Sequence, residues 1–372
     1  DGNSSLLLPR QDTRPLETPD LWNPSLNNSQ VSAIQCALNA PAVSIIHGPP
    51  GTGKTSTLTE LILQAVHRGL KVLVCAPSNI AVDTILGRLA DYQQSNNASK
   101  KRSSRTKAAP ERRKCAVNMV RVGHPARISS KIMKYALDSI ISTDEGTDIV
   151  KDVRKDIDEL RQAMSKKGKR RPANQDEPGV SFAQVKRDQR SEMRSLMKEA
   201  RQRERAVVVN ILRKADIVLS TCVGAGSRLL KDLQFDMVVI DEAAQGLEAA
   251  CWIPILKINS QTGGTCVLAG DHCQLPPTIK SPQAERGGLS VTLFERIIRD
   301  KRFAAVVRLL NIQYRMHHSI SDWASEQMYH GAIISHESVA HHTLRDIIGS
   351  SHVQESASAS EGAEGAECNK TP

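Results

Sequence analysis

Short runs of apolar residues recur along the chain, and most precede a segment whose apolar positions have helical spacing. The runs are rich in β-branched side chains and contain few polar positions, which is typical of strands buried on both faces. They lie at 42–47, 71–76, 117–122, 215–220, 235–240, 265–269 and 304–310. Helical spacing is clear at 56–68 and 289–299. The alternation predicts an α/β fold with a parallel sheet.

Polar residues follow several of these runs directly. Ser78 and Asn79 follow the second run, where a helix is expected to begin. The pair Asp241 and Glu242 follows a later run, and 270–277 follows the next. Ligands of parallel sheets bind beyond the carboxyl ends of the strands, so we expect these residues to gather at one edge. Ser78 and Asn79 could hold a phosphodiester backbone there or simply cap the helix.

The remaining segments suggest three further features. A helix is expected after Leu26, with Ser29 as its N-cap. Residues 93–114 are basic and polar, which predicts a disordered loop. The apolar positions of 148–164 and 182–200 have helical spacing, and a basic turn lies between them. We expect an antiparallel helical hairpin that projects from the body, either toward nucleic acid or as a self-stabilised arm with a soluble tip.

The clearest chemical motif is Gly48-Pro-Pro-Gly-Thr-Gly-Lys-Thr55, which lies between the first strand and the helix at 56–68. It fits the phosphate-binding loop, in which glycines let backbone N–H groups converge on phosphate oxygens at a helix N-terminus. Lys54 would reach the β- and γ-phosphates of ATP, and the Thr55 hydroxyl would hold Mg²⁺. We expect the nucleotide to contact Gly48, Pro49, Pro50, Gly51, Thr52, Gly53, Lys54, Thr55 and Ser56.

The residues after the later strands could complete the chemistry of such a site. Asp241 is the expected second partner of Mg²⁺, and Glu242 could accept a proton from an attacking water. Gln245 or Gln274 could sense the γ-phosphate, since an amide can bond both a phosphate and a water. These roles require the loops to meet at the sheet edge.

Three residues outside these loops could also contact the nucleotide. Gln30 precedes the phosphate loop and could bind the adenine edge through its amide, although a solvated Gln is the plainer interpretation. Arg315 could supply positive charge to phosphoryl transfer if the segment after 303 closes over the site. Tyr314 beside it could stack on the base.

Composition narrows the class of protein. The 372 residues carry a net charge of +10, which suits an anionic partner such as nucleic acid. The sequence shows no secretory signal and no segment of transmembrane length, and its eight cysteines form no C-x-x-C pair, so we expect reduced thiols in the nucleus and/or cytoplasm. A GTPase is disfavoured because no N-K-x-D motif follows the loop. The pairs His317-His318 and His341-His342 should point apart, so we expect no zinc site.

Together the motifs resemble those of superfamily 1 helicases. The resemblance is to the 5′-to-3′ branch of the nonsense-mediated-decay RNA helicase, and within it to the immunoglobulin-mu-binding-protein and DNA-polymerase-alpha-associated helicases. It runs from about Leu26 to about Asp346. The motifs that carry it are Leu26-Asn-Asn-Ser-Gln30, His47-Gly-Pro-Pro-Gly-Thr-Gly-Lys-Thr55, Ala76-Pro-Ser-Asn-Ile-Ala-Val-Asp83, Val122-Gly-His-Pro-Ala-Arg127, Asp241-Glu-Ala-Ala-Gln245, Cys251-Trp-Ile-Pro254, Gly270-Asp-His-Cys-Gln-Leu-Pro-Pro277 and Gln313-Tyr-Arg-Met-His317.

The resemblance implies a RecA-like P-loop NTPase domain followed by the beginning of a second RecA-like domain, with ATP between them. Residues 1–25 would be an extended lead-in, 26–302 the first domain and 303–372 the truncated second. Within the first domain, 93–114 would be the basic loop and 128–206 a helical insertion. Because the chain stops before the last helicase motifs, we expect a fragment that hydrolyses ATP weakly alone.

The resemblance also assigns roles to individual residues. Lys54, Asp241, Glu242, Gln274 and Arg315 would be catalytic, with Thr55 and Asp241 on Mg²⁺, Gln274 as the γ-phosphate sensor and Arg315 as an arginine finger. Gln30 would bind adenine and Tyr314 would stack on the base. The single strand would be followed by Ser78, Asn79, Thr221 and Gly224.

The predicted function is an ATP-dependent helicase or translocase that couples Mg-ATP hydrolysis to 5′-to-3′ movement on single-stranded DNA or RNA. Backbone contacts do not separate DNA from RNA; of the two we expect DNA. The main alternative is a P-loop ATPase that remodels protein or ribonucleoprotein complexes without unwinding. A nucleic-acid-binding module with a vestigial ATP site is disfavoured by Lys54, Asp241 and Glu242. We expect no membrane contact, and replication or ribonucleoprotein partners are left open.

Overall fold

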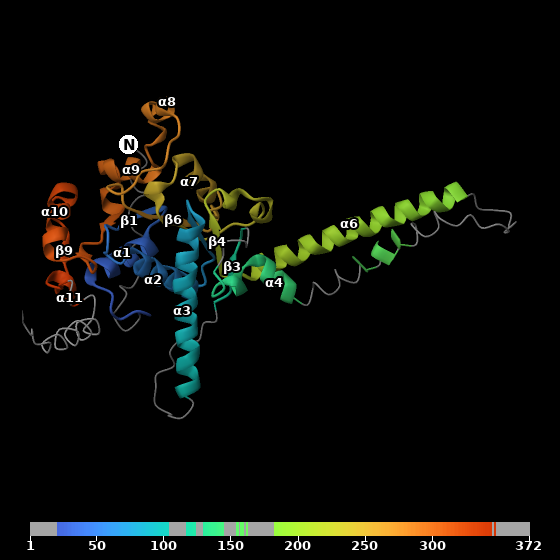
Figure 1. Ribbon diagram of the computed structural model, residues 1–372, viewed down its shortest axis with the longest axis horizontal. Helices are drawn as coiled ribbons and strands as arrows, with labels where there is room; N and C mark the ends of the chain where they lie inside the picture. The colour runs from blue at the N-terminus through green and yellow to red at the C-terminus, as the bar shows by residue number, and fades with distance from the viewer. Residues whose placement is uncertain are drawn as a thin grey trace, which may run out of the picture.

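The predicted strands form one parallel sheet (Figure 1). In the described part of the chain it has seven strands in the order β3-β4-β2-β5-β6-β1-β7. Their bounds are Val43–His47 for β1, Val72–Ala76 for β2, Met119–Arg121 for β3, Ile217–Thr221 for β4, Met237–Ile240 for β5, Thr265–Gly270 for β6 and Val307–Leu309 for β7. The α/β fold with a parallel sheet is therefore confirmed.

The computed structural model describes residues 21–103, 117–123, 129–144, 154–155, 157–159, 161–162, 182–343 and 346. Several expectations lie outside these residues. They concern the lead-in at 1–20, the loop at 104–114, the motif residues 124–127, the basic turn at 166–172 and the tail from 350.

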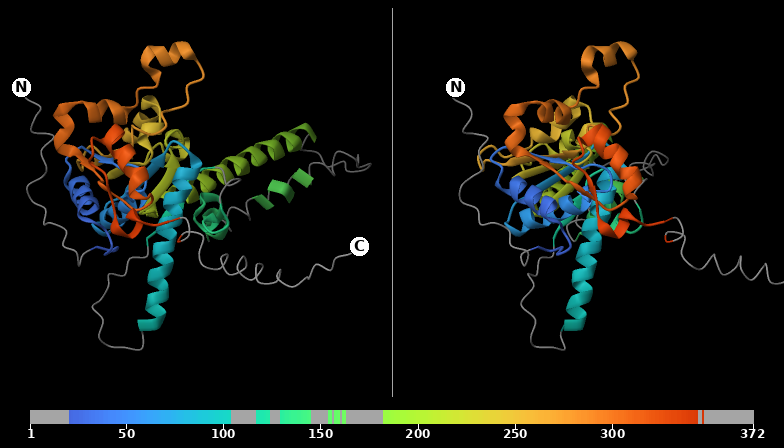
Figure 2. Two further views of the ribbon diagram at one scale, coloured as in Figure 1. Left: turned by 60° about the vertical axis from the view of Figure 1, so that its left-hand side comes forward. Right: turned by 90° about the vertical axis from the view of Figure 1, so that its left-hand side faces the viewer.

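Helices cover both faces of the sheet (Figure 2). Alternate strand residues face opposite layers: in β2, Val74 joins the core beneath α1, α2 and α3, whereas Leu73 and Cys75 join the core beneath α7, α9 and the end of α6. The helices are α1 Asn28–Asn39, α2 Lys54–His67, α3 Asn79–Ser103, α4 Leu137–Thr143, α6 Phe182–Lys214, α7 Glu248–Ile255, α8 Pro282–Ala284, α9 Leu293–Arg299, α10 His318–Tyr329 and α11 Glu337–Ala340.

The N-cap of α1 differs from the prediction. Asn27, not Ser29, caps the helix: its side chain accepts a hydrogen bond from the backbone of Gln30, whose side chain accepts one from the backbone of Asn27. A capping box needs an amide or carboxylate side chain three residues after the cap. Gln30 stands at that position for Asn27, whereas Ser32 stands there for Ser29. Ser29 instead donates to the Asn27 side chain at 2.7 Å.

The basic segment at 93–114 was expected to be disordered from its first residue, and this is wrong for its first half. Helix α3 continues through it to Ser103. The apolar residues that anchor α3, such as Ile85 and Leu89, lie in its first turns and are fully buried. A helix nucleated there extends into polar sequence, because elongation adds one hydrogen bond per residue.

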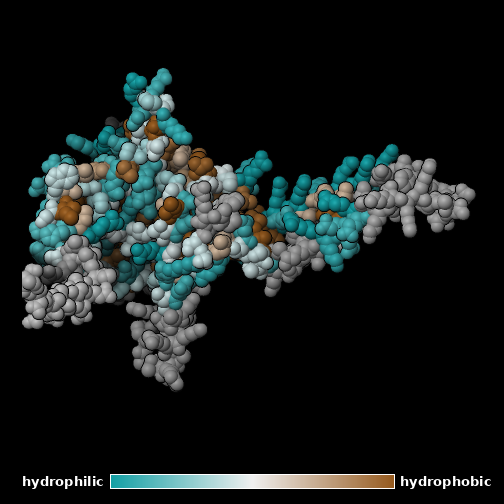
Figure 3. Space-filling view, viewed as in Figure 1, coloured by the Kyte–Doolittle hydropathy of each residue, from teal (hydrophilic) through white to brown (hydrophobic). Residues whose placement is uncertain are grey.

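The helical hairpin is confirmed in its described part, and α6 projects from the body as a long arm (Figure 1). Ile157 packs against Ala200 and Leu196 of α6, and Arg154 Nη2 lies 2.6 Å from Glu204 Oε1. The earlier residue of one leg meets the later residue of the other, so the legs are antiparallel. The surface of the arm is mainly hydrophilic (Figure 3).

The segment after 303 begins inside the first sheet. Strand β7 pairs with β1, and Leu310 N donates to His47 O at 2.9 Å. The predicted domain start at 303 therefore precedes a strand of the first sheet, and the division into two domains stays a prediction. After β7, β8 (Ile312–Gln313) and β9 (Ile334–Ser335) form a separate two-stranded parallel sheet, and α10 connects them.

None of the described helices has the length and apolar character that a transmembrane span requires. The cysteines of the described part are free thiols, and four of them, Cys75, Cys222, Cys251 and Cys266, are buried.

Replacing Ile157 with Asp is expected to separate the hairpin legs without unfolding the sheet, because their apolar cluster is small and separate from the main core. Limited proteolysis should reveal new cleavage between 154 and 204, whereas the unfolding midpoint should move by no more than about 2 °C. The matched control is Lys155→Asp, since the Lys155 side chain is 77% exposed. A cleavage pattern equal to that of the unchanged chain would contradict the packing.

Candidate active site and nucleic-acid interface

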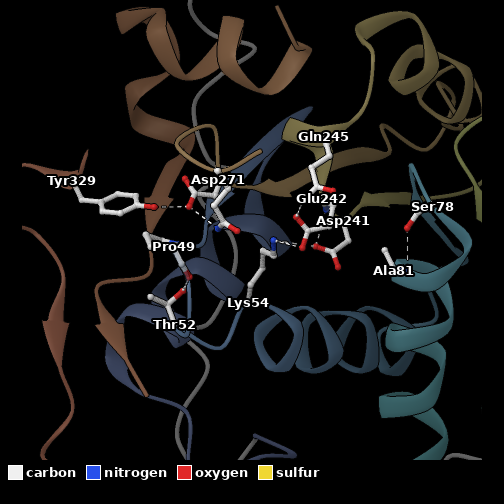
Figure 4. Close-up of polar contacts among 11 residues, drawn as sticks. Pro49, Thr52, Lys54, Ser78, Ala81, Asp241, Glu242, Gln245, Asp271 and Tyr329 are labelled. Carbon is white, nitrogen blue, oxygen red and sulfur yellow. Dashed lines mark hydrogen bonds and ion pairs between the residues drawn. The ribbon is translucent and has the colours of Figure 1, made fainter. Parts of the chain in front are cut away.

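The phosphate-binding loop connects β1 to α2 with two residues in the left-handed region. Gly51 has φ 76° and Gly53 has φ 80°, and α2 begins immediately after Gly53. The loop is braced internally by Thr52, whose hydroxyl donates to Pro49 O at 2.7 Å (Figure 4). The first N–H groups of α2 therefore face the loop, as a phosphate site requires.

Close packing also requires glycine at these positions. A Cβ on Gly51 would lie 2.6 Å from Cβ of Arg315, and one on Gly53 would lie 2.4 Å from Nε2 of Gln30. The loop is therefore held between the first helix and the segment after β8. This contact places the Cβ of Arg315 beside the phosphate-binding loop, and its role as an arginine finger stays a prediction.

Three charged residues meet in front of the loop (Figure 4). Lys54 Nζ lies 2.7 Å from Glu242 Oε1 and 3.8 Å from Asp241 Oδ1. Glu242 has φ 51°, a strained conformation for a non-glycine residue, and its N–H donates to Asp241 Oδ1. The structure thus brings together Lys54, the first residue of α2, and both predicted acidic residues, which follow β5 directly.

Asp241 is the most buried of these three side chains. Burial raises the pKa of Asp241 to about 6, and the nearby charge of Glu242 adds to the rise while Lys54 opposes it. A divalent cation would favour the ionised form. The Asp241 carboxylate and the Thr55 hydroxyl supply the oxygen donors that Mg²⁺ prefers, so the residues present fit the metal.

The two candidate phosphate-sensing glutamines have different partners. Gln245 Nε2 donates to Glu242 Oε2 at 3.4 Å, and Gln274 Nε2 donates to Asp271 Oδ2 at 2.7 Å. Burial alone would raise the pKa of Asp271, but hydrogen bonds from His47, Gln274 and Tyr329 lower it to about 2. Asp271 is therefore an ionised anchor. Sequence reasoning gave it no role, although it lies in a quoted motif.

Gln30 supports the phosphate loop in this structure. It is 4% exposed, its Nε2 donates to Thr52 O at 3.0 Å, and its Oε1 accepts from Asn27 N. Adenine binding by Gln30 stays a prediction. Tyr314 accepts from Asn27 Nδ2 at 3.1 Å, and its ring lies 4.6 Å from that of His336. Base stacking by Tyr314 likewise stays a prediction.

Gln313 shapes the turn that presents Tyr314 and Arg315. Its buried Oε1 accepts from the N–H groups of Arg315 and Met316, both at 2.7 Å, and its Nε2 donates to Ser335 Oγ. The next residue, Tyr314, donates its N–H to Gly51 O at 2.9 Å. Sequence reasoning missed this role; the signal was a single Gln at the end of a strand.

The four predicted nucleic-acid residues lie at neighbouring strand ends. Strands β2 and β4 are paired, and their last residues, Ala76 and Thr221, lie side by side. Ser78 and Gly224 come shortly after these residues, so they lie at the same edge of the sheet. Thr221 Oγ1 accepts from Gly224 N at 3.1 Å. The Ser78 hydroxyl accepts from Ala81 N, so its capping role is present as well (Figure 4).

A buried arginine fixes Asn79. Arg121 is 1% exposed; its Nη2 donates to Asn79 Oδ1 at 2.7 Å and its Nε to Asp83 Oδ1 at 2.9 Å. No described residue accepts from the NH₂ group of Asn79, which is exposed. The amide is therefore oriented with its donors toward solvent. Sequence reasoning missed Arg121 because only tertiary contact joins β3 to α3.

The expectation that adjacent histidines point apart is wrong for His317 and His318. The rings of His317 and His318 lie 4.4 Å apart, and His341 lies 5.2 Å from His318. One ligand atom from each of the three falls within 4.8 Å of the others. His317 is the N-cap of α10, so its backbone is extended and the alternation assumed for a regular helix does not hold.

Known proteins match most of the chain. Two family models described as AAA domain match residues 25–282 and 289–364. "DNA-binding protein SMUBP-2" of Rattus norvegicus is 44% identical over 345 residues, covering 91% of this chain and 31% of that protein.

Two further relatives also match about nine tenths of this chain. "DNA polymerase alpha-associated DNA helicase A" of Schizosaccharomyces pombe is 36% identical, covering 88% of this chain and 42% of its own length. "Regulator of nonsense transcripts 1 homolog" of Drosophila melanogaster is 32% identical, covering 90% and 23%. The chain spans less than half the length of each of these relatives.

The raised pKa of Asp241 predicts a pH-dependent stability. A folded pKa of about 6 against an ordinary 3.8 destabilises the fold once the group ionises. This penalty is absent below about pH 4, grows up to about pH 6 and is then at most about 3 kcal/mol. Without nucleotide, Asp241→Asn should therefore melt above the unchanged chain at about pH 7.5, and the difference should shrink toward pH 4.

Thermal unfolding of both chains across this pH range measures the effect. The matched control is Asp232→Asn, because Asp232 is exposed. A stability difference for Asp241→Asn that does not vary with pH would contradict the burial argument.

Proposed function

The chain belongs to the superfamily 1 helicases, and from this premise we propose that it is an ATP-driven motor on single-stranded nucleic acid. The observation that carries the proposal is the shared sheet edge. The phosphate loop and Asp241 follow β1 and β5, and the candidate strand contacts follow the adjacent β2 and β4. A change at the nucleotide can therefore reach the bound single-stranded nucleic acid through neighbouring loops of one sheet edge.

The loop residues would perform the hydrolysis. Lys54 would turn from Glu242 to the β- and γ-phosphates, which releases the Glu242 carboxylate to take a proton from the attacking water. Mg²⁺, held by Thr55 and Asp241, would neutralise phosphate charge when bound. Arg315, exposed beside Gly51, would add positive charge in the transition state.

The single-stranded nucleic acid would lie across the carboxyl ends of β2 and β4. Asn79 offers an amide donor and Thr221, whose oxygen accepts from Gly224 N, offers a hydroxyl donor to phosphate oxygens. Backbone contacts of this kind do not depend on base sequence. Two of the relatives are named for DNA, which supports DNA as the substrate. Movement from 5′ to 3′ and a location in the nucleus and/or cytoplasm belong to the same proposal.

The alternative is an ATPase that remodels protein or ribonucleoprotein complexes. It shares the loop and the acidic pair, but it does not need Asn79 oriented toward solvent by a buried arginine. The two functions differ in whether a polynucleotide changes the rate of ATP hydrolysis.

ATP hydrolysis with Mg²⁺ is expected to rise several-fold with single-stranded DNA, and the rise should fade with salt because phosphate contacts release counterions. Lys54→Ala should abolish nucleotide binding. Glu242→Gln should bind ATP and lose about 10²–10⁴-fold in rate, as a lost general base does. Steady-state turnover and nucleotide titration measure both.

Glu192→Gln is the control, because Glu192 is exposed on α6. Turnover that ignores single-stranded DNA and RNA alike would favour the remodelling ATPase. Unchanged turnover in Glu242→Gln would reject Glu242 as the base.

Asn79→Asp should weaken the binding of single-stranded DNA without lowering the stability of the fold. It keeps the oxygen that pairs with Arg121 but replaces the exposed NH₂ group by negative charge, so affinity for single-stranded DNA should fall about tenfold. Thermal stability should hold or rise, because a buried guanidinium gains a second carboxylate. Asn79→Ala, the comparison, should lower both quantities. Fluorescence anisotropy and thermal unfolding measure them, and unchanged affinity in Asn79→Asp would exclude Asn79 from the interface.

A further inference from the structure

One carboxylate joins three separate parts of the molecule behind the nucleotide site. Asp271 follows β6 and is 2% exposed. Its Oδ1 lies 3.0 Å from His47 Nε2, at the end of β1, and accepts from Cys273 N at 3.1 Å. Its Oδ2 accepts from Gln274 Nε2 and from the hydroxyl of Tyr329, both at 2.7 Å.

Tyr329 comes from a distant part of the chain. It is the last residue of α10, it is 6% exposed, and its ring lies 5.9 Å from that of His47. Its hydroxyl points to the Asp271 carboxylate (Figure 4). Helix α10 lies beyond β7, in the segment that begins with the turn at Gln313. The same short segment thus contacts the phosphate loop through Arg315 at one end and the Asp271 carboxylate through Tyr329 at the other.

The two donors to Oδ2 constrain each other. A side-chain amide has its oxygen and NH₂ group on opposite sides, so an NH₂ group fixed on Asp271 directs the Gln274 oxygen elsewhere. The hydroxyl of Tyr329 is the second donor to the same oxygen, which has two lone pairs. If α10 withdraws, Oδ2 loses one donor and the amide of Gln274 gains room to rotate.

We propose, on the basis of the proposed function, that Tyr329 is a positioning residue that couples the placement of α10 to the orientation of Gln274. Gln274 is the residue expected to contact the γ-phosphate and the attacking water. Its geometry then depends on whether the segment after β7 is seated. Hydrolysis is fast only when Arg315 and Tyr329, at the two ends of that segment, are both in contact.

Tyr329→Phe in the whole chain tests this, because it removes the hydroxyl and keeps the buried ring. With saturating single-stranded DNA, kcat should fall about tenfold, the loss expected for one hydrogen bond to a charged group. KM for ATP should stay within about twofold, since the phosphate loop is untouched. Tyr135→Phe is the matched control: Tyr135 donates its hydroxyl to Gln93, far from Asp271 in the chain and on another element.

A double-mutant cycle separates positioning from general loss of structure. If Tyr329 acts through Gln274, adding Tyr329→Phe to Gln274→Ala should lower kcat no further. Additive losses, or a kcat for Tyr329→Phe equal to that of the unchanged chain, would overturn the proposal. An unchanged chain that hydrolyses ATP without response to DNA would reject the motor function instead, and the cycle on basal turnover would still test the link.

Discussion

Parallel pairing of the strands is the constraint on which the site depends. Because the strands run in one direction, residues far apart in sequence, such as Lys54, Asp241 and Asp271, follow strand ends that lie side by side. No loop has to be long to bring them together. The order of the strands also sets the layout of the edge, with the phosphate loop beside β6 and the candidate strand contacts beside β2 and β4.

Charge at this edge is balanced in a way that suits an incoming phosphate. Lys54 has two carboxylates within 4 Å, one of them held by a left-handed backbone and the other buried with a raised pKa. Such an arrangement places a strained backbone and a buried carboxyl side by side, and both cost free energy. Phosphate oxygens and a divalent cation would satisfy Lys54 and Asp241 separately, so binding would relieve the repulsion between Asp241 and Glu242 and leave the latter free to act.

Local pattern predicted the strands, the phosphate loop, the acidic pair and the helical hairpin, because each depends on nearby sequence and on the period of burial. Two of the errors concern which of several neighbouring polar residues caps a helix. Asn27 replaces Ser29 as the cap because the capping box needs Gln30, and His317 leaves the helical pattern by becoming a cap itself. The roles of Arg121 and Gln313 could not be predicted, since a buried polar residue is defined by partners that the fold supplies.

The contacts of the segment after β7 show why the first sheet and this segment act as one site. Tyr314 donates its backbone N–H to Gly51 O, and Cβ of Arg315 leaves no room for a side chain at Gly51. Gly51 is also a residue whose backbone must adopt a positive φ to expose its neighbours to phosphate. A displacement of the segment would therefore remove a backbone hydrogen bond from the phosphate loop and open space beside it. The shape of the loop and the seating of Arg315 are thus determined by the same contact, which makes nucleotide geometry sensitive to a part of the chain that follows the sheet.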